Sequence, residues 1–235
     1  PDAVVLVTTI KALKYHGGVE KENIQKENIE AIKNGLHNLY KHIDNIKNKF
    51  GLNVIVALNK YYTDTKEEID FLTQKLKEKQ IEISIVEGWE KGGEGAIDIA
   101  NKIVELANKN SNLNYMYELE DDIKTKILKV STKIYGAKNV IYSKEAEEQI
   151  EKINLFGYSN LPICIAKTQY SFSDDPKNLE CKNDYSINVK SVELKAGAGF
   201  IVVIAGNIMT MPGLPKMPAA ENIDIDKDGN IIGLF

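Results

Sequence analysis

The chain has 235 residues, of which 43% are hydrophobic and 27% charged, a composition that is typical of a globular protein and excludes a disordered one. The formal net charge is -4 and all 30 basic residues are lysines, so no nucleic-acid-binding surface is expected. Any phosphate or carboxylate site must then use lysine, backbone N–H groups or helix N-termini, because the sequence contains no arginine. No apolar run reaches the roughly 18 residues that span a bilayer, so no membrane partner is expected.

The first part of the chain alternates between apolar runs and helical patterns. Apolar runs predict buried strands of a parallel sheet at residues 3–8 and 53–58, the first of them buried on both faces, and a third strand is predicted at 81–86. Apolar residues at helical spacing predict helices at 28–49, 65–79 and 96–107. Thr65 and Glu68 have the spacing of a capping box at the start of the second helix, and a glycine-rich loop over 88–95 precedes the third. This order predicts an α/β fold with a parallel sheet.

A polar linker at 108–114 marks a boundary near residue 110, which divides the chain into parts 1–110 and 111–235. The second part is expected to be mixed α+β. Its predicted helices cover 115–135 and 143–153, and its predicted strands cover 162–166, 185–194 and 200–205. The alternative is that the parts 1–110 and 111–235 share one hydrophobic core.

The last segment predicts an extended tail. Prolines exclude a helix or a central strand there, because each removes a backbone donor; they are Pro212, Pro215 and Pro218. The apolar side chains are expected to pack on the body or on a neighbouring subunit; they are Met209, Met211, Leu214 and Met217. Lys216 is then a weak catalytic candidate that reaches into a cleft, and a solvated lysine is the alternative.

Aromatic residues follow two of the predicted strands. Tyr61 and Tyr62 come after the second strand, and Trp89, the only tryptophan, comes after the third. Ligands of open α/β sheets bind outside the carboxyl ends of the strands. The pattern therefore predicts an aromatic clamp for a flat heterocycle, with aromatic packing at a domain seam as the alternative.

Other candidate sites carry weaker signals. His16 precedes two glycines and is a weak candidate for a catalytic base, with a structural loop histidine as the alternative. The glycines at 92–95 lack the Lys-Ser/Thr of a phosphate loop, and those at 197–199 precede a strand rather than a helix. The aspartates at 224–228 lack the glutamate of a calcium loop. Cys164 and Cys181 show no zinc-ligand spacing, so no metal site is expected and both thiols are predicted to be reduced in a cytosolic protein.

Five long segments together resemble the formate–tetrahydrofolate ligase family. They are PDAVVLVTTIKALKYHGGV, VALNKYYTDT, VEGWEKGGEGAIDIA, LPICIAKTQYSFSDDP and GAGFIVVIAGNIMTMPGLPKMPAAENIDID. The resemblance implies a cytoplasmic, P-loop-NTPase-related enzyme that joins formate to N10 of tetrahydrofolate through formyl phosphate. It also implies ATP with Mg²⁺, a monovalent cation, and a homotetramer.

By position, the resemblance implies that Trp89 stacks on the pterin, that Tyr61 faces it, and that Ile85 lines the same pocket. The family has a loop near the nucleotide base at 179–185, where this sequence departs from the family pattern. The family's phosphate loop has no counterpart here, so the chain is interpreted as the C-terminal portion of such an enzyme, and the isolated fragment is expected to be inactive. The alternatives are a non-catalytic α/β scaffold and a free-standing folate-binding protein.

Overall fold

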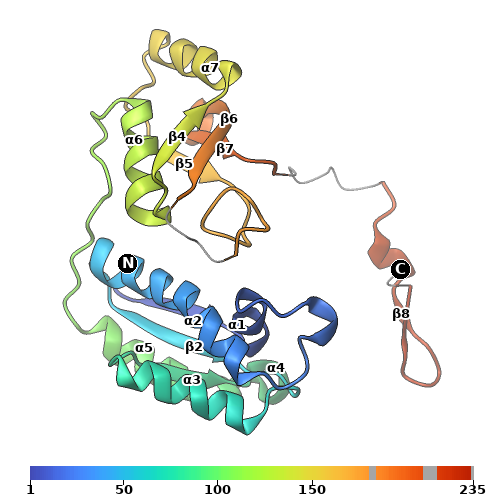
Figure 1. Cartoon of the computed structure of the whole chain (residues 1–235). Coiled ribbons are helices and arrows are strands. Elements are labelled where there is room, and N and C mark those ends of the chain that lie inside the picture. The colour runs from blue at the N-terminus through green and yellow to red at the C-terminus, as the bar shows by residue number, and fades with distance from the viewer. Residues whose placement is uncertain (180–183, 209–215, 234–235) are drawn as a thin grey trace.

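The computed structural model describes residues 1–179, 184–208 and 216–233, and the chain forms two larger sheets in succession (Figure 1). The first sheet is fully parallel, in the order β1-β2-β3. Its strands are β1 (Val4–Thr8), β2 (Val54–Asn59) and β3 (Ile83–Val86). Because all three run the same way, their carboxyl ends lie at one edge of the sheet.

Helices cover the two faces of this sheet unequally. One face packs on α1 (Ile10–His16), α2 (Ile29–Asp44) and α3 (Lys66–Glu78), and the other packs on α5 (Ile97–Ala107). Alternation along β2 explains both contacts, since Val56 and Leu58 enter the first core while Ile55 and Ala57 enter the second. The predicted helices therefore form where their apolar stripes meet the sheet, and the predicted capping box of Thr65 and Glu68 is present at the start of α3.

Helices α1 and α2 approach each other closely at two glycines. A Cβ atom on Gly35 of α2 would lie 2.0 Å from the Leu13 carbonyl oxygen, and one on Gly17 would lie 1.8 Å from the Ala31 carbonyl oxygen. Both obstacles are backbone atoms, so no side chain can move aside to make room. This contact fixes α1, and with it the residues that follow β1, against the rest of the sheet.

Replacing Gly35 with alanine is therefore expected to lower the free energy of unfolding by about 1–3 kcal/mol, the usual cost of overpacking. Helix propensity alone predicts that this substitution raises the free energy of unfolding, since alanine is favoured over glycine in a helix by about 1 kcal/mol. Urea unfolding of Gly35→Ala measures the difference. Gly93→Ala is the control because a Cβ atom there meets nothing within 4 Å. A Gly35→Ala protein as stable as the wild type contradicts the close approach.

The second sheet has the strand order β4-β6-β7-β5 and mixed directions. Its strands are β4 (Asn139–Tyr142), β5 (Ile163–Ala166), β6 (Ser186–Lys195) and β7 (Phe200–Ala205). Only the β6–β7 pair is antiparallel. Helices α6 (Ile123–Val130) and α7 (Lys144–Leu155) bury their apolar sides against it. The predicted α/β class, with a parallel sheet followed by a mixed part, is confirmed.

Three expectations were wrong in detail, and one strand was missed. The helix predicted over 115–135 begins only at Ile123, because the Asp122 carboxylate accepts a hydrogen bond from the Thr125 N–H and caps it there. The glycine-rich loop at 88–95 forms the short helix α4 (Gly88–Lys91) and a 3-10 turn. Strand β1 is not buried on both faces: Val7 is 62% exposed, because the core on the α5 side forms over β2 and β3 and does not include Val7. The short strand β4 was not predicted.

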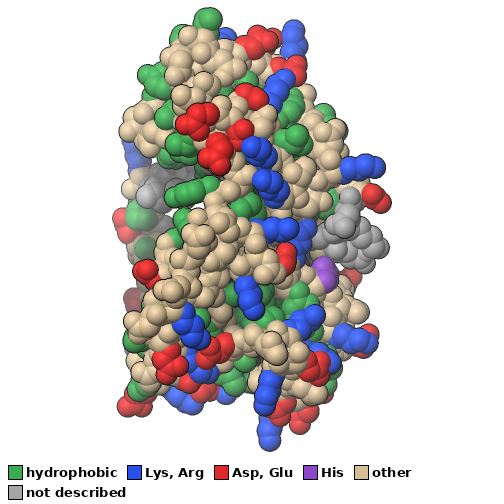
Figure 2. All heavy atoms as spheres, turned by 90° about the vertical axis from the view of Figure 1, so that its left-hand side faces the viewer, with side chains coloured by type: hydrophobic (Ala, Val, Ile, Leu, Met, Phe, Trp, Pro, Cys, Tyr) green, Lys and Arg blue, Asp and Glu red, His purple; other side chains and the backbone are tan. Residues whose placement is uncertain are grey.

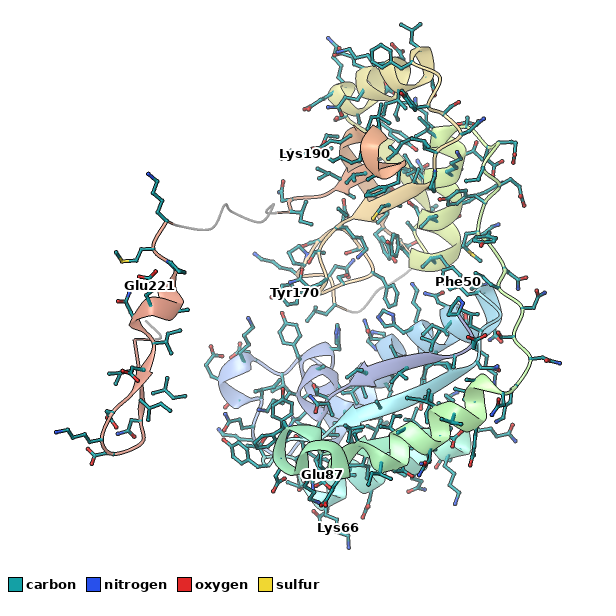
Figure 3. The ribbon with its side chains drawn as sticks, turned by 180° about the vertical axis from the view of Figure 1, so that it is seen from behind. Phe50, Lys66, Glu87, Tyr170, Lys190 and Glu221 are labelled. Atoms are coloured by element: carbon teal, nitrogen blue, oxygen red, sulfur yellow. The ribbon has the colours of Figure 1, made fainter. Side chains whose placement is uncertain are left out.

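The tail also differs from expectation. Residues 209–215 include Met209, Met211 and Leu214 and lie outside the described part of the chain. Met217 is 67% exposed and so does not pack on the body of this chain, while its expected packing on a neighbouring subunit stays a prediction. The described end of the tail carries the hairpin of β8 (Asp224–Ile225) and β9 (Ile231–Ile232), which lies apart from both larger sheets in Figures 1 and 3.

The two parts of the chain meet at the C-terminal end of α2 and at the residue that follows it. Asn45 donates a hydrogen bond of 3.0 Å to the Ile134 carbonyl, and Lys41 donates one to the Tyr135 carbonyl. The His42 ring packs on Phe172 with 4.4 Å between ring centroids. Figure 2 shows lysine side chains and a histidine near mid-height, where the two parts adjoin.

Candidate functional site

The residues that follow β2 and β3 form the candidate site. Asn59 pairs with Val86 at the ends of these strands, so the segments beginning at Lys60 and at Glu87 leave the sheet side by side. Lys60 also donates its backbone N–H to the Val86 carbonyl at 3.0 Å. The sheet therefore brings together the two aromatic segments that the sequence places 28 residues apart, at Tyr61 and Trp89.

Trp89 lies at the protein surface on α4, with 59% of the residue exposed. Its indole Nε1–H donates a hydrogen bond of 2.9 Å to the carbonyl oxygen of Lys60, the residue next to Tyr61. Tyr61 is half-buried, and the ammonium of Lys11 lies 4.3 Å from its ring centroid. Ile85, on β3, is 40% exposed. An exposed indole fixed at its polar edge leaves its π face available to a flat ligand.

Glu87 is shared by two lysines at this site. Its carboxylate oxygens each lie 2.6 Å from an ammonium nitrogen, one from Lys60 and the other from Lys91. Hydrogen bonds from Lys60 and then Lys91 lower the pKa of the Glu87 carboxyl to about 2. Glu87 is therefore ionised at neutral pH and joins the end of β2 to the end of α4. The sequence patterns gave no sign of this pairing, because it depends on where α4 sits.

A second carboxylate supports the turn that carries Tyr61. The Oδ2 atom of Asp64 accepts the Tyr61 backbone N–H at 2.8 Å. Burial raises the pKa of Asp64, because desolvation disfavours the charged form. Asp64 Oδ1 and Thr63 Oγ1 are buried without a hydrogen-bond partner among the described residues.

Beneath this edge lies a buried ion pair that sequence analysis missed. Lys14 of α1 and Glu68 of α3 are 2.9 Å apart, with side chains 1% and 0% exposed. Glu68 also accepts hydrogen bonds from the backbone N–H groups of Asn28 and Thr65. The capping box located Glu68, but its lysine partner is 54 residues away in the sequence and no local pattern links them.

The two weak catalytic candidates are not brought together by an observed contact. His16 ends α1, and its Nδ1 atom is buried without a hydrogen-bond partner among the described residues. It lines a cavity of about 810 Å³ with His37 and Lys177. Burial and then the nearby His37 lower the pKa of His16. Lys216 is exposed in the tail, which lies apart from both sheets (Figure 1).

A further histidine at the boundary between the two parts gives a pH prediction. Desolvation, followed by His16, Lys167 and Lys41, lowers the pKa of His42 from 6.5 to about 4. Between pH 6.5 and about 4, the His42 ring is protonated in the unfolded chain but neutral in the folded protein. The free energy of unfolding is therefore expected to fall as pH decreases through this range. Solvent screening limits the loss to about 1 kcal/mol. Urea unfolding at several pH values measures it. His42→Gln should reduce the slope and leave the part that His16 contributes through its own lowered pKa, and an unchanged slope in His42→Gln contradicts the assignment.

Metal-binding geometry is absent from the part of the chain that the structure describes, where no group of three or more histidine, cysteine, aspartate or glutamate residues could hold an ion. Asp226 instead organises the β8–β9 turn by accepting hydrogen bonds from the backbone N–H groups of Asp228 and Asn230. Residues 197–199 form the expected turn into β7, with Gly199 at φ 75°. Within the described residues, no helix is long and apolar enough to cross a membrane.

A parallel sheet whose strands end beside an exposed, anchored tryptophan has the geometry of a ligand-binding α/β protein. A sequence model of the formate–tetrahydrofolate ligase family matches residues 1–235. The chain therefore belongs to the formate–tetrahydrofolate ligase family. These are ATP-dependent ligases of folate-linked one-carbon metabolism, with tetrahydrofolate, formate and ATP as substrates.

Proposed function

We propose that residues 1–235 supply the tetrahydrofolate-binding face of an enzyme that joins formate to N10 of the folate. The pterin stacks on Trp89 with Tyr61 opposite, and Ile85 borders it. The observation that carries the proposal is the hydrogen bond from the Trp89 indole to the Lys60 carbonyl, which holds an exposed ring next to the segment bearing Tyr61.

The chemistry assigned to this face is positioning. ATP and formate give formyl phosphate and ADP. The N10 lone pair then attacks the carbonyl carbon of formyl phosphate, phosphate leaves with the electron pair of the broken C–O bond, and the proton on N10 passes to solvent or to the departing phosphate. Holding a flat ring between two aromatic side chains fixes N10 relative to the acyl carbon, and such orientation supplies several kcal/mol of barrier reduction. His16 and Lys216 stay weak candidates for catalytic roles.

ATP, Mg²⁺ and the monovalent cation are assigned to residues outside this chain. In support, the sequence has no GxxxxGK[ST] motif, and the described residues offer no cluster of metal ligands. On this proposal the chain is a C-terminal portion that is inactive alone. We also propose a cytoplasmic homotetramer; exposed apolar side chains near the end of α7, including Leu155 at 84%, support an assembly surface.

Titrating the 235-residue protein with tetrahydrofolate tests the proposal. Saturable quenching of the Trp89 emission is expected, without ATP-dependent formation of formyltetrahydrofolate above background. No binding favours a non-catalytic scaffold, whereas turnover by this chain alone contradicts the assignment of the ATP site to other residues. If the protein encoded by the longest natural reading frame binds tetrahydrofolate but does not form formyltetrahydrofolate, a free-standing folate-binding protein is favoured.

A further inference from the structure

The only tryptophan of the chain sits on an element that is too short to hold it in place. Helix α4 has four residues, Gly88–Lys91, and isolated helices of that length are unstable in water. Gly92 and Gly93 follow it, and a Cβ atom at either would meet nothing within 4 Å. No side chain packs on α4 at these two glycines, whereas the backbone of Gly95 approaches its start closely, since a Cβ atom there would lie 2.5 Å from the Glu87 carbonyl. Polar contacts add to this restraint on the orientation of α4.

Those contacts converge on Glu87, the residue that joins β3 to α4. Its carboxylate binds Lys60 at the end of β2 and Lys91 at the end of α4, each at 2.6 Å. Its backbone carbonyl accepts the N–H of Lys91 at 2.9 Å, which closes the single turn of the helix. Its own N–H donates to the Gly95 carbonyl at 3.0 Å, which returns the chain to the sheet.

We propose that Glu87 is a positioning residue for Trp89: by binding Lys60 and Lys91 together, it holds α4 against the end of β2, so that the indole stays hydrogen-bonded to the Lys60 carbonyl before any ligand arrives. Lys60 thus serves twice, through its ammonium to Glu87 and through its carbonyl to Trp89. The consequence for folate binding rests on the proposed function, whereas the positioning itself is a property of the ligand-free protein.

Charge is essential to this arrangement. A carboxylate accepts from two ammonium groups at once, and such charge-assisted hydrogen bonds are roughly twice as strong as neutral ones. In Glu87→Gln, the amide –NH₂ group is a donor and cannot bind a lysine. One of the two lysines therefore loses its partner while the side-chain volume is kept. A ring that is ordered in advance also binds its ligand more tightly, because less entropy is lost on binding.

The single indole N–H resonance of ligand-free protein is the direct readout. In Glu87→Gln, the Trp89 Nε1–H is expected to move towards the position of a solvent-bonded indole and to exchange with water about tenfold faster. Lys91→Gln removes only the ion pair between Lys91 and Glu87, so the shift and the exchange rate of the indole N–H should change in the same direction but by less. Glu90→Gln removes one negative charge from α4 itself, and Glu90 has no side-chain hydrogen bond among the described contacts, so this variant should match the wild type.

Tetrahydrofolate titration then separates the two proposals. About tenfold weaker binding by Glu87→Gln, with Glu90→Gln unchanged, supports both. If the wild type does not bind tetrahydrofolate, the proposed function fails, yet the resonance of the ligand-free variants still decides the role of Glu87. Wild-type exchange in both Glu87→Gln and Lys91→Gln, with the fold intact, overturns the positioning role. If Glu87→Gln does not fold, Lys91→Gln alone decides it.

Discussion

Replacing Trp89 with alanine is expected to weaken tetrahydrofolate binding by about 1–3 kcal/mol, the loss that follows removal of one stacked aromatic side chain. The indole is 59% exposed, so its removal leaves no cavity in either core, and the melting temperature should change little. Equilibrium binding of tetrahydrofolate, measured beside thermal unfolding, separates affinity from stability.

Two variants sharpen this test. Trp89→Phe keeps a π face but loses the donor to Lys60, so an intermediate affinity is expected. Tyr62→Ala removes a neighbouring aromatic side chain that is 77% exposed, and it serves as the control. A Trp89→Ala protein that binds tetrahydrofolate as tightly as the wild type, with its fold intact, refutes the aromatic clamp.

Breaking the ion pair between Lys14 and Glu68 is expected to have the largest effect on stability. Glu68→Gln or Lys14→Met leaves an uncompensated charge or polar group in a dry interior, and removing one partner of a buried pair costs about 3–5 kcal/mol. Glu68→Gln also leaves one of the Thr65 and Asn28 backbone N–H groups without its acceptor, because these groups bind different carboxylate oxygens and the amide retains only one oxygen. Urea unfolding measures both losses.

The matched control is the pair of Glu30 and Lys33 on α2, whose side chains are 69% and 60% exposed. Glu30→Gln is expected to change the free energy of unfolding by less than about 0.5 kcal/mol, as for other exposed pairs. A double-mutant cycle on Lys14 and Glu68 isolates their coupling. Equal, small losses for the buried and exposed pairs would mean that Lys14 and Glu68 do not interact as the structure shows.

Local chemistry was enough to predict much of the first part of the chain. The apolar run of β2, the amphipathic stripe of α2 and the capping box at Thr65 each depend on residues within a few positions of one another. The parallel order followed, because strands separated by helices leave few other connections. The aromatic pattern after β2 and β3 identified the candidate site for the same reason, since the carboxyl ends of parallel strands share one edge.

Only the tertiary structure determined the ion pairs and the side-chain burial that involve residues far apart in the sequence. Lys14 is an ordinary lysine in the sequence and becomes a buried cation only because α1 packs beside the start of α3. Val7 has the pattern of a fully buried strand, yet it is exposed because the core on the α5 side forms over β2 and β3 and does not reach it. Glu87 acquires its role only when β2 and β3 pair and bring Lys60 within 2.6 Å. Sequence determined which residues prefer strand, helix or turn, and the fold determined which charges meet, because Coulomb and hydrogen-bond energies depend on distance in space rather than along the chain.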